Sequence, residues 1–147
     1  MTVTPSVDDA HRRPAGTSDI TIKALGKLSE ALEVVDNARG QLYSFHRLSG
    51  KADLALGEAV DLLREAGHTA IADRLEKVMV GRNVIEGRWT FQIVEDYDDN
   101  YYAAFSAEEK KARDELVAGK KHIFEAEMKE DRRTHGKRHH EATPHES

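Results

Sequence analysis

Four polar residues fall at positions that helical spacing assigns to apolar faces. When the sequence is projected at about 100° per residue, Arg39 and His46 fall among the leucines of one long segment, and Asp98 and Glu127 fall among apolar residues of later segments. A buried charge without a partner is unfavourable by several kcal/mol, so carboxylates in such places need a cation. The sequence therefore predicts a buried polar cluster of Arg39, His46, Asp98 and Glu127.

Two kinds of chemistry fit this cluster. Salt bridges from the carboxylates to Arg39 are the ordinary solution. The alternative is a divalent-metal site inside a helical bundle, with His46, Asp98 and Glu127 as ligands. The paired Glu-x-x-His motif of ferritin-like di-iron proteins is missing, because Tyr43 stands three residues before His46. No cofactor is predicted other than this alternative of a metal ion.

An aromatic-rich segment at residues 89–105 is the second candidate for function. It holds six of the nine aromatic residues, and several of them recur at every fourth position. Tyrosine and tryptophan are favoured anchors of protein interfaces, and two adjacent tyrosines cannot both face one narrow core stripe. These residues form either the core or an interface for a partner protein or a second copy of the chain. The candidate interface residues are Trp89, Tyr97, Tyr101, Tyr102 and Phe105.

The C-terminal segment is rich in histidine and basic residues. His135 and His139 are one helical turn apart, a spacing that supports weak chelation of a divalent ion. Interspersed acidic residues and a net charge of −5 weaken any attraction to nucleic acid. A nucleic-acid or ribosome accessory role is therefore only a further alternative. The histidines are His135, His139, His140 and His145, and the basic residues are Lys129, Arg132, Arg133, Lys137 and Arg138.

Several classes of function lack support in the sequence. It contains no glycine-rich phosphate loop, no dinucleotide-binding fingerprint, no Gly-x-Ser-x-Gly elbow and no His-Glu-x-x-His motif. The absence of cysteine excludes disulfides and thiolate ligands, and no stretch is apolar enough for a signal peptide or a membrane span. We therefore expect a cytoplasmic, non-enzymatic protein without a membrane partner.

The elements that would position these residues are predicted to be helices. All three prolines lie outside residues 15–143, and proline is the residue that a helix interior tolerates least. Ser18 is a good N-cap for a helix over 18–48, and glycines 50, 67 and 81 are placed to end helices over 18–48, 52–66 and 69–80. The helix over 52–66 is predicted to bury Ala55, Ala59, Val60, Leu62, Leu63 and Ala66.

The second half of the chain is predicted to follow the same pattern. Residues 82–88 are expected to form a loop, and 89–105 favour a helix over a strand because the four-residue spacing persists. Ser106 and Glu109 form a capping-box pattern, which predicts that a new helix begins near Ala107 and continues to about Arg133. The expected fold is an all-α bundle of four to five helices at residues 18–134, with long first and last helices. Residues 1–17 and 135–147 are predicted to be disordered tails.

The function predicted from these observations is that of a small protein-interaction or regulatory factor that binds a protein partner or forms a homodimer. The alternatives are a metal-binding, ferritin-like bundle and a nucleic-acid or ribosome accessory protein.

Overall fold

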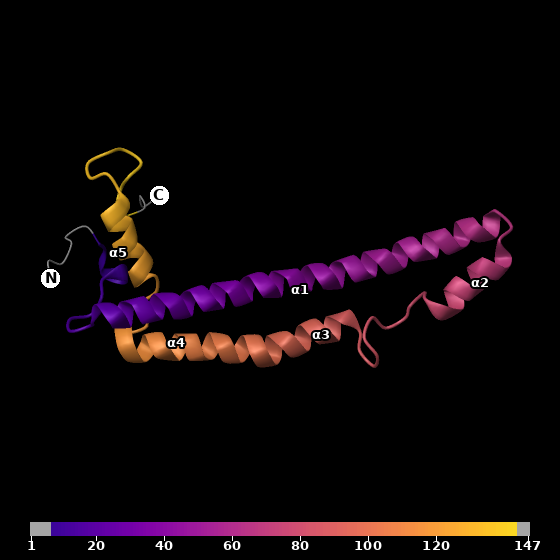
Figure 1. Cartoon of the computed structure of the whole chain (residues 1–147), viewed down its shortest axis with the longest axis horizontal. Coiled ribbons are helices and arrows are strands. Elements are labelled where there is room, and N and C mark those ends of the chain that lie inside the picture. Colours follow the sequence, from indigo (N-terminus) through magenta and orange to yellow (C-terminus); the bar gives the residue numbers. More distant parts are fainter. Residues whose placement is uncertain (1–6, 144–147) are drawn as a thin grey trace. The chain divides into compact units, whose positions relative to one another are not determined.

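The structure is a computed structural model, and residues 7–143 are described here. The all-α prediction is confirmed, since 72% of the described residues are helical and none of them forms a strand (Figure 1). The helices in chain order are η1 (Asp9–His11), α1 (Asp19–Glu65), α2 (Thr69–Val78), α3 (Thr90–Tyr97), the π-helix η2 (Asp98–Tyr102), α4 (Ala103–Val117) and α5 (Ile123–Arg132).

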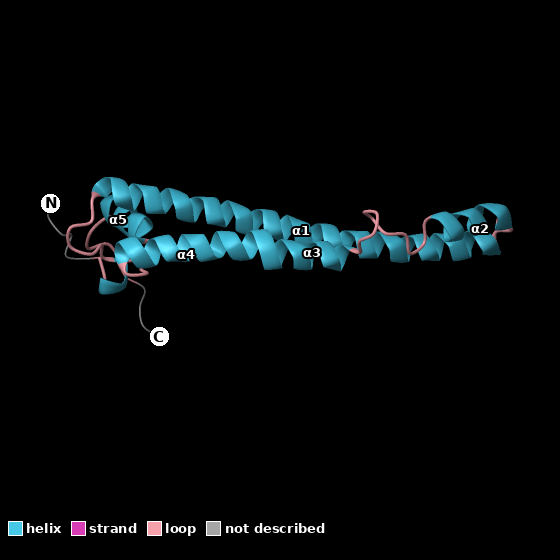
Figure 2. Ribbon diagram, turned by 90° about the horizontal axis from the view of Figure 1, so that it is seen from below, coloured by secondary structure: helices cyan, strands magenta, loops and turns pink. Residues whose placement is uncertain are grey.

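The chain divides into two compact units. Unit 1 consists of Met1–Val34 and Ala104–Ser147, and unit 2 consists of Val35–Ala103. Unit 1 contains the beginning of α1, nearly all of α4, and α5. Unit 2 contains the rest of α1 together with α2, α3 and η2, with α2 folded back beside the end of α1 (Figure 2).

Helix α1 is continuous through 47 residues, so the predicted break at Gly50 is wrong. Gly50 lies within the helix and does not adopt the left-handed conformation that ends one. A glycine in a helix interior weakens it by about 1 kcal/mol without interrupting it. The end comes instead at Gly67, which has a φ of 89°. The predicted N-cap is confirmed, because the Ser18 hydroxyl accepts a hydrogen bond from the Thr21 N–H at 3.2 Å.

Unit 1 has a small apolar core formed by Ile22, Leu25, Val117 and Ile123. The helix predicted over 107–133 proves to be two helices. No helix begins near Ala107, because α4 already starts at Ala103, and it ends at Val117. Left-handed residues at 118, 119 and 122 then turn the chain, and α5 begins at Ile123. The capping-box pattern at Ser106 and Glu109 wrongly predicted a helix start, because both residues lie inside α4, which begins three residues before Ser106.

Unit 2 confirms the predicted loop at 82–88 and the helical preference of residues 89–105. Its buried apolar residues are few among those described: Val35, Val60, Ala72 and Val94. The predicted burial of the face over 52–66 is therefore only partly correct. Val60 is buried and Leu63 is half-buried, but the remaining members of that face are exposed. These exposed members are Ala55, Ala59, Leu62 and Ala66.

Part of each predicted tail makes contacts. Val7 is buried, and the Lys120 ammonium donates a hydrogen bond to the Arg12 carbonyl at 2.8 Å. Near the other end, the Arg133 guanidinium donates to the His140 carbonyl at 3.1 Å. The predicted disorder of residues 1–6 and 144–147 lies outside the described residues. Residues 7–17 and 135–143 both belong to unit 1. Their contacts show that parts of the predicted tails pack against the rest of that unit.

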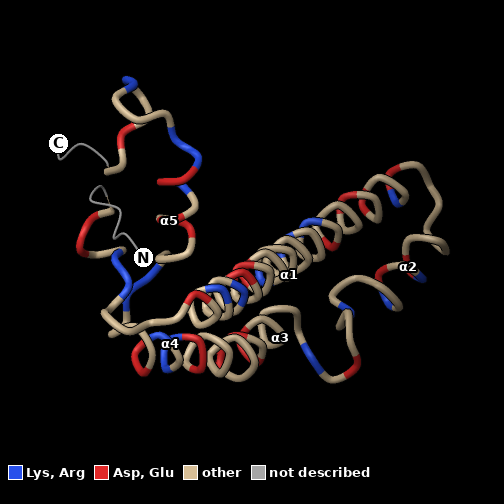
Figure 3. The backbone as a smooth tube through the Cα atoms, turned by 60° about the vertical axis from the view of Figure 1, so that its left-hand side comes forward, with Lys and Arg blue, Asp and Glu red and all other residues tan. Residues whose placement is uncertain are grey.

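Acidic and basic residues are interspersed along α1 and α4 (Figure 3). Although α1 is long, neither it nor any other helix in the described part of the chain carries an apolar stretch able to cross a membrane.

Candidate functional site

The most organised polar group in unit 2 joins α1 to η2. The Arg39 guanidinium donates two hydrogen bonds to the Asp98 carboxylate, Nε to Oδ1 at 2.7 Å and an Nη to Oδ2 at 3.0 Å. The Tyr43 hydroxyl donates a third at 2.9 Å. A two-pronged arginine–carboxylate contact fixes orientation as well as proximity. The Arg39–Asp98 salt bridge that the sequence offered as the ordinary solution is present, but the predicted burial is wrong, because the two side chains are 35% and 22% exposed.

Aromatic rings complete this group. The guanidinium carbon of Arg39 lies 5.2 Å from the Tyr43 ring centre and 4.6 Å from that of Tyr102. The Tyr102 hydroxyl donates to the Asp36 carboxylate at 2.6 Å. Both Asp98 and Tyr102 belong to the π-helix, a form that inserts an extra residue per turn and is frequent at functional sites. We call Asp36, Arg39, Tyr43, Asp98 and Tyr102 the Arg39 cluster.

The Arg39 cluster has a consequence for acid stability. The hydrogen bonds from Arg39 hold the pKa of the Asp98 carboxyl below its ordinary value of 3.8; partial desolvation opposes this effect, and the bond from Tyr43 adds to it. A carboxyl whose pKa is lowered by folding stabilises the protein at pH values above this ordinary, unfolded-state pKa. This contribution is lost as the pH falls through the lower, folded-state pKa.

We therefore expect the wild type to have a higher free energy of unfolding than Asp98→Asn. This difference should be largest above about pH 4 and should decrease at lower pH. Urea unfolding of both proteins between pH 7 and pH 3 measures this difference. Asp99→Asn changes an exposed neighbouring carboxylate and is the matched control. A difference for Asp98→Asn that stays constant across this range would contradict the assignment.

His46 is placed in unit 2 by a contact between α1 and the first residue of α3. One ring nitrogen, Nδ1, lies 2.7 Å from the Thr90 hydroxyl oxygen. Arg39 and His46 thus both face the helical segment that follows the loop, as their shared position on α1 predicted. His46 therefore pairs with a neutral hydroxyl rather than with a carboxylate.

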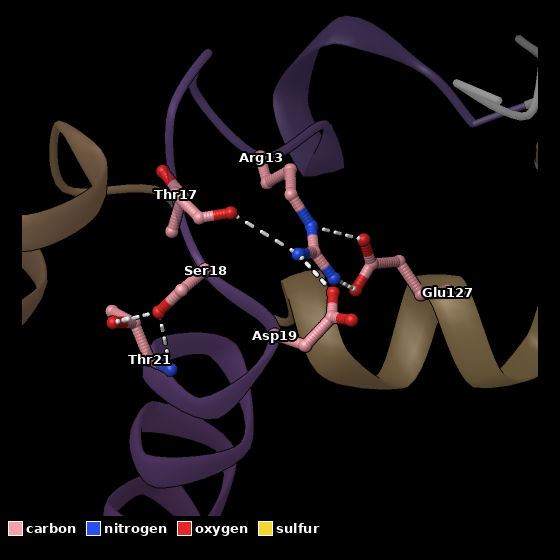
Figure 4. Close-up of polar contacts among 6 residues, drawn as sticks. All are labelled: Arg13, Thr17, Ser18, Asp19, Thr21 and Glu127. Atoms are coloured by element: carbon pink, nitrogen blue, oxygen red, sulfur yellow. Dashed lines mark hydrogen bonds and ion pairs between the residues drawn. The ribbon is translucent and has the colours of Figure 1, made fainter. Parts of the chain in front are cut away.

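Glu127 is paired within unit 1. Arg13 donates to its two carboxylate oxygens at 2.7 and 2.9 Å, and also donates to Asp19 at 2.6 Å and to the Thr17 carbonyl at 3.2 Å (Figure 4). The bond to Glu127 is the largest cause of the raised pKa of Arg13. The predicted salt bridge from Glu127 to Arg39 is therefore wrong, and its actual partner was not considered because Arg13 falls in a segment predicted to be disordered.

The residues proposed as metal ligands are thus engaged by other groups: Asp98 by Arg39, Glu127 by Arg13 and His46 by Thr90. A different set in unit 1 has ligand-like geometry. The ligand atoms of Glu33, His122 and Glu125 all lie within 4.8 Å of one another. Glu33 and His122 are exposed and Glu125 is half-buried. This set combines one imidazole with two carboxylates.

The aromatic segment is divided between exposed and partly buried rings. Trp89 is 58% exposed and Tyr101 is 54% exposed, whereas Tyr97, Tyr102 and Phe105 are half-buried. Trp89 packs edge-to-face on Phe91, with ring centres 5.2 Å apart. The two adjacent tyrosines do point differently, as the sequence suggested. Tyr102 joins the Arg39 cluster, while Tyr101 keeps most of its surface in solvent.

An open groove runs between α1 and the loop that leads to Trp89. Its wall on α1 includes Asp53, whose carboxylate accepts a hydrogen bond from the Gly81 N–H at 2.8 Å and so holds the loop in place. Trp89 and Thr90 line a neighbouring hollow that shares several of the same residues. The groove is lined by Ser49, Ala52, Asp53, Leu56, Met79, Arg82, Asn83 and Val84.

The acid-first spacing of four between Glu109 and Arg113 predicts a helical ion pair, but the burial of this pair in unit 1 was not predicted from the sequence. Arg113 donates from Nε to Glu109 at 2.7 Å and from an Nη to the Gly119 carbonyl at 2.8 Å, and both side chains of the pair are buried. Ser29 on α1 donates to the same Glu109 oxygen at 3.2 Å. A signal was available, because the four-residue series that runs from Trp89 to Phe105 continues through 109, 113 and 117.

The basic C-terminal segment is partly neutralised. Arg133 donates two hydrogen bonds to the buried Glu130, at 2.7 and 3.0 Å, and His135 lies 2.5 Å from the same carboxylate. Fewer of its cations are therefore available to bind phosphates, and contact with nucleic acid stays a prediction.

Unit 2 thus has exposed aromatic and aliphatic side chains beside a groove, and unit 1 brings Glu33, His122 and Glu125 close together. Searches against models of protein families, characterised proteins and solved structures gave no match to this chain, so the case for its function rests on its own residues.

Proposed function

We propose that this protein is a non-enzymatic interaction factor of the cytoplasm that binds another protein chain through unit 2. The observation that carries the proposal is the exposure of large apolar residues around the groove, above all that of Trp89. Large apolar side chains exposed beside a groove are typical of an interaction site.

The surroundings of Trp89 support this role. Val84 and Ile85 in the preceding loop are each at least half exposed, as is Tyr101 farther along the chain. Aromatic and aliphatic anchors beside a groove are the usual centre of a protein interface. The Arg39 cluster fixes η2 against α1, so Tyr101 is presented from a rigid element. A rigid anchor loses less side-chain entropy on binding.

The proposal is tested by quantitative affinity capture with the full chain from the cells that produce it. We expect the wild type to retain a reproducible set of proteins that Trp89→Ala loses. Ile20→Ala is the matched control, because Ile20 is 71% exposed but belongs to unit 1. Retention of the same set by Trp89→Ala, or no retention by the wild type above background, would contradict the proposal.

A divalent-metal role is the second candidate function, favoured by the cluster of Glu33, His122 and Glu125. One imidazole with two carboxylates is a donor set that suits zinc, manganese or iron rather than magnesium or calcium. The two carboxylates come from different helices, and their negative charges approach each other beside His122. A bound cation would neutralise both.

Titration calorimetry with zinc, and separately with manganese, tests this second role. We expect His122→Ala to weaken the tightest binding by about tenfold or more. His68→Ala, which removes an exposed histidine from unit 2, is expected to leave it unchanged. The wild type and both variants keep the C-terminal histidines, so any metal binding by those residues contributes equally to all three titrations. Equal affinities for the two variants would eliminate the cluster as a metal site.

A further inference from the structure

The second half of α1 carries a continuous exposed stripe with the spacing of a coiled-coil seam. Its members alternate in steps of three and four residues, and all of them are exposed. All but one are apolar, and Leu48 and Leu62 are 63% and 64% exposed. The seam consists of Ala38, Gln41, Phe45, Leu48, Ala52, Ala55, Ala59 and Leu62 on α1, followed by Ala66 in the turn directly after the helix.

The seam is distinct from the face of α1 that packs within unit 2. That inner face is marked by a row repeating every seven residues: Arg39 bonds to Asp98, His46 to Thr90, Asp53 to Gly81, and Val60 is buried. Each member of the row follows a seam residue by one position, which turns it about 100° around the helix. The seam therefore has no covering element among the described residues of unit 2.

We propose that a second copy of this chain covers the seam, with the two α1 helices packed antiparallel. This inference rests on the proposed interaction function and names the partner for this second surface, which shares Ala52 with the wall of the groove. Heptad spacing is the requirement for two helices to pack side by side along their length. Alanine at Ala52, Ala55 and Ala59 allows the helix backbones to approach closely at the centre, with larger residues on either side.

The antiparallel arrangement makes the seam complementary to itself, as a two-fold dimer requires. Ala52 faces Ala55 of the partner subunit, and Leu48 faces Ala59 of the partner subunit. Phe45 faces Leu62 of the partner subunit. Gln41 then faces Ala66 of the partner subunit, so the polar member of the seam lies at the edge of the contact.

Charged residues beside the seam favour this register over the registers that are shifted by one heptad. Lys51 and Glu58 flank the seam at equivalent positions of successive heptads, and in this register Lys51 lies beside Glu58 of the partner subunit. A shift by one heptad in one direction would place Lys51 beside Lys51 of the partner subunit. A shift in the other direction would bring the two Glu58 residues together. Opposite charges at such flanking positions determine partner choice and orientation.

A parallel dimer lacks this complementarity. In a parallel coiled coil, Lys51 would lie beside Leu56 of the partner subunit, leaving the charge next to an apolar side chain. The sequence of the seam and its flanks therefore favours the antiparallel pair.

Sedimentation analysis of Leu62→Glu tests the seam. We expect the wild type to have about twice the chain mass of 16.5 kDa, and Leu62→Glu to raise the dimer dissociation constant about thirtyfold or more. Leu54→Glu is the matched control, because Leu54 is on the same helix and is 72% exposed but lies off the seam. Unchanged circular dichroism shows that both variants remain helical. A monomeric wild type, or equal weakening by the two variants, would overturn the proposal.

Charge reversal tests the register independently. Lys51→Glu should weaken the dimer, and the double variant Lys51→Glu with Glu58→Lys should restore it. Within one chain these residues are seven positions apart, beyond the three or four at which side chains on a helix interact. Failure of the second substitution to restore dimerisation would overturn the proposed register.

Cysteine cross-linking tests the direction, because the chain has no cysteine of its own. A mixture of Leu48→Cys and Ala59→Cys should form a disulfide-linked heterodimer on oxidation, and neither variant alone should link to itself. Self-linking of Leu48→Cys alone would indicate parallel helices and overturn the proposal.

These outcomes separate this inference from the interaction function on which it rests. A monomeric protein that still shows Trp89-dependent capture would reject the seam dimer alone. If Trp89→Ala abolished the dimer and Leu62→Glu did not, the seam dimer would be rejected, and the second copy would instead bind at the surface around Trp89. Loss of Trp89-dependent capture with an intact seam dimer would reject the proposed role of the Trp89 surface.

Discussion

Replacement of Arg113 by methionine should lower the free energy of unfolding by about 3 to 5 kcal/mol. The substitution preserves much of the side-chain volume but leaves the buried Glu109 without its cation. It also removes the hydrogen bond to the Gly119 carbonyl, which follows the end of α4. Removing one partner of a buried ion pair is costly because the remaining charge is still shielded from water. Urea unfolding measures the change.

The same helix provides a matched control for this prediction. Lys110 and Asp114 form an ion pair with the same four-residue spacing, but both side chains are largely exposed. Lys110→Met should therefore change the free energy of unfolding by about 0.5 kcal/mol or less. The double variant Glu109→Leu with Arg113→Met should recover most of the loss, since it leaves no unpaired charge. Equal effects of Arg113→Met and Lys110→Met would show that burial of the pair is unimportant.

Substitution of Gly26 by leucine should destabilise unit 1 by about 2 kcal/mol, because it forces extra atoms into a filled contact. A Cβ atom at Gly26 would lie 2.8 Å from Cγ and 2.9 Å from Cβ of Phe124. Those atoms are at the base of the phenylalanine side chain, so the backbone of α5 would have to move with them. Thermal unfolding and the intensity of the helical circular dichroism signal measure the effect.

Gly40 is the matched control, since a Cβ there would meet nothing within 4 Å. Gly40→Leu should stabilise α1 by about 0.5 to 1 kcal/mol, because leucine has the higher helix propensity. The two substitutions on one helix are therefore expected to have opposite signs. A stabilising Gly26→Leu would show that α5 is not held against α1 at this position.

The local elements of this protein were largely predictable from its sequence. Ser18 as an N-cap, the turn at Gly67 and the loop at 82–88 follow from properties of single residues and their immediate neighbours. The Arg39–Asp98 pair was also predictable, since a charge on an apolar face requires an opposite charge. The cap, the turn and the loop depend on backbone conformation and short-range spacing, which the sequence states directly. For the Arg39–Asp98 pair, the sequence indicated only the need for an opposite charge, since the two residues are 59 positions apart.

Only the tertiary structure showed what covers each face. Periodicity shows that Ala55, Ala59 and Leu62 share a side of α1, but the same pattern is expected whether that side is buried within the chain or left for a partner. The pairing of Glu127 with Arg13 joins residues 114 positions apart. Such a contact depends on how the turn at 118–122 directs α5, and that turn is set by backbone conformations which no helical spacing encodes. A helical pattern determines which residues lie together on one face, whereas the packing of distant segments determines which of those faces are buried.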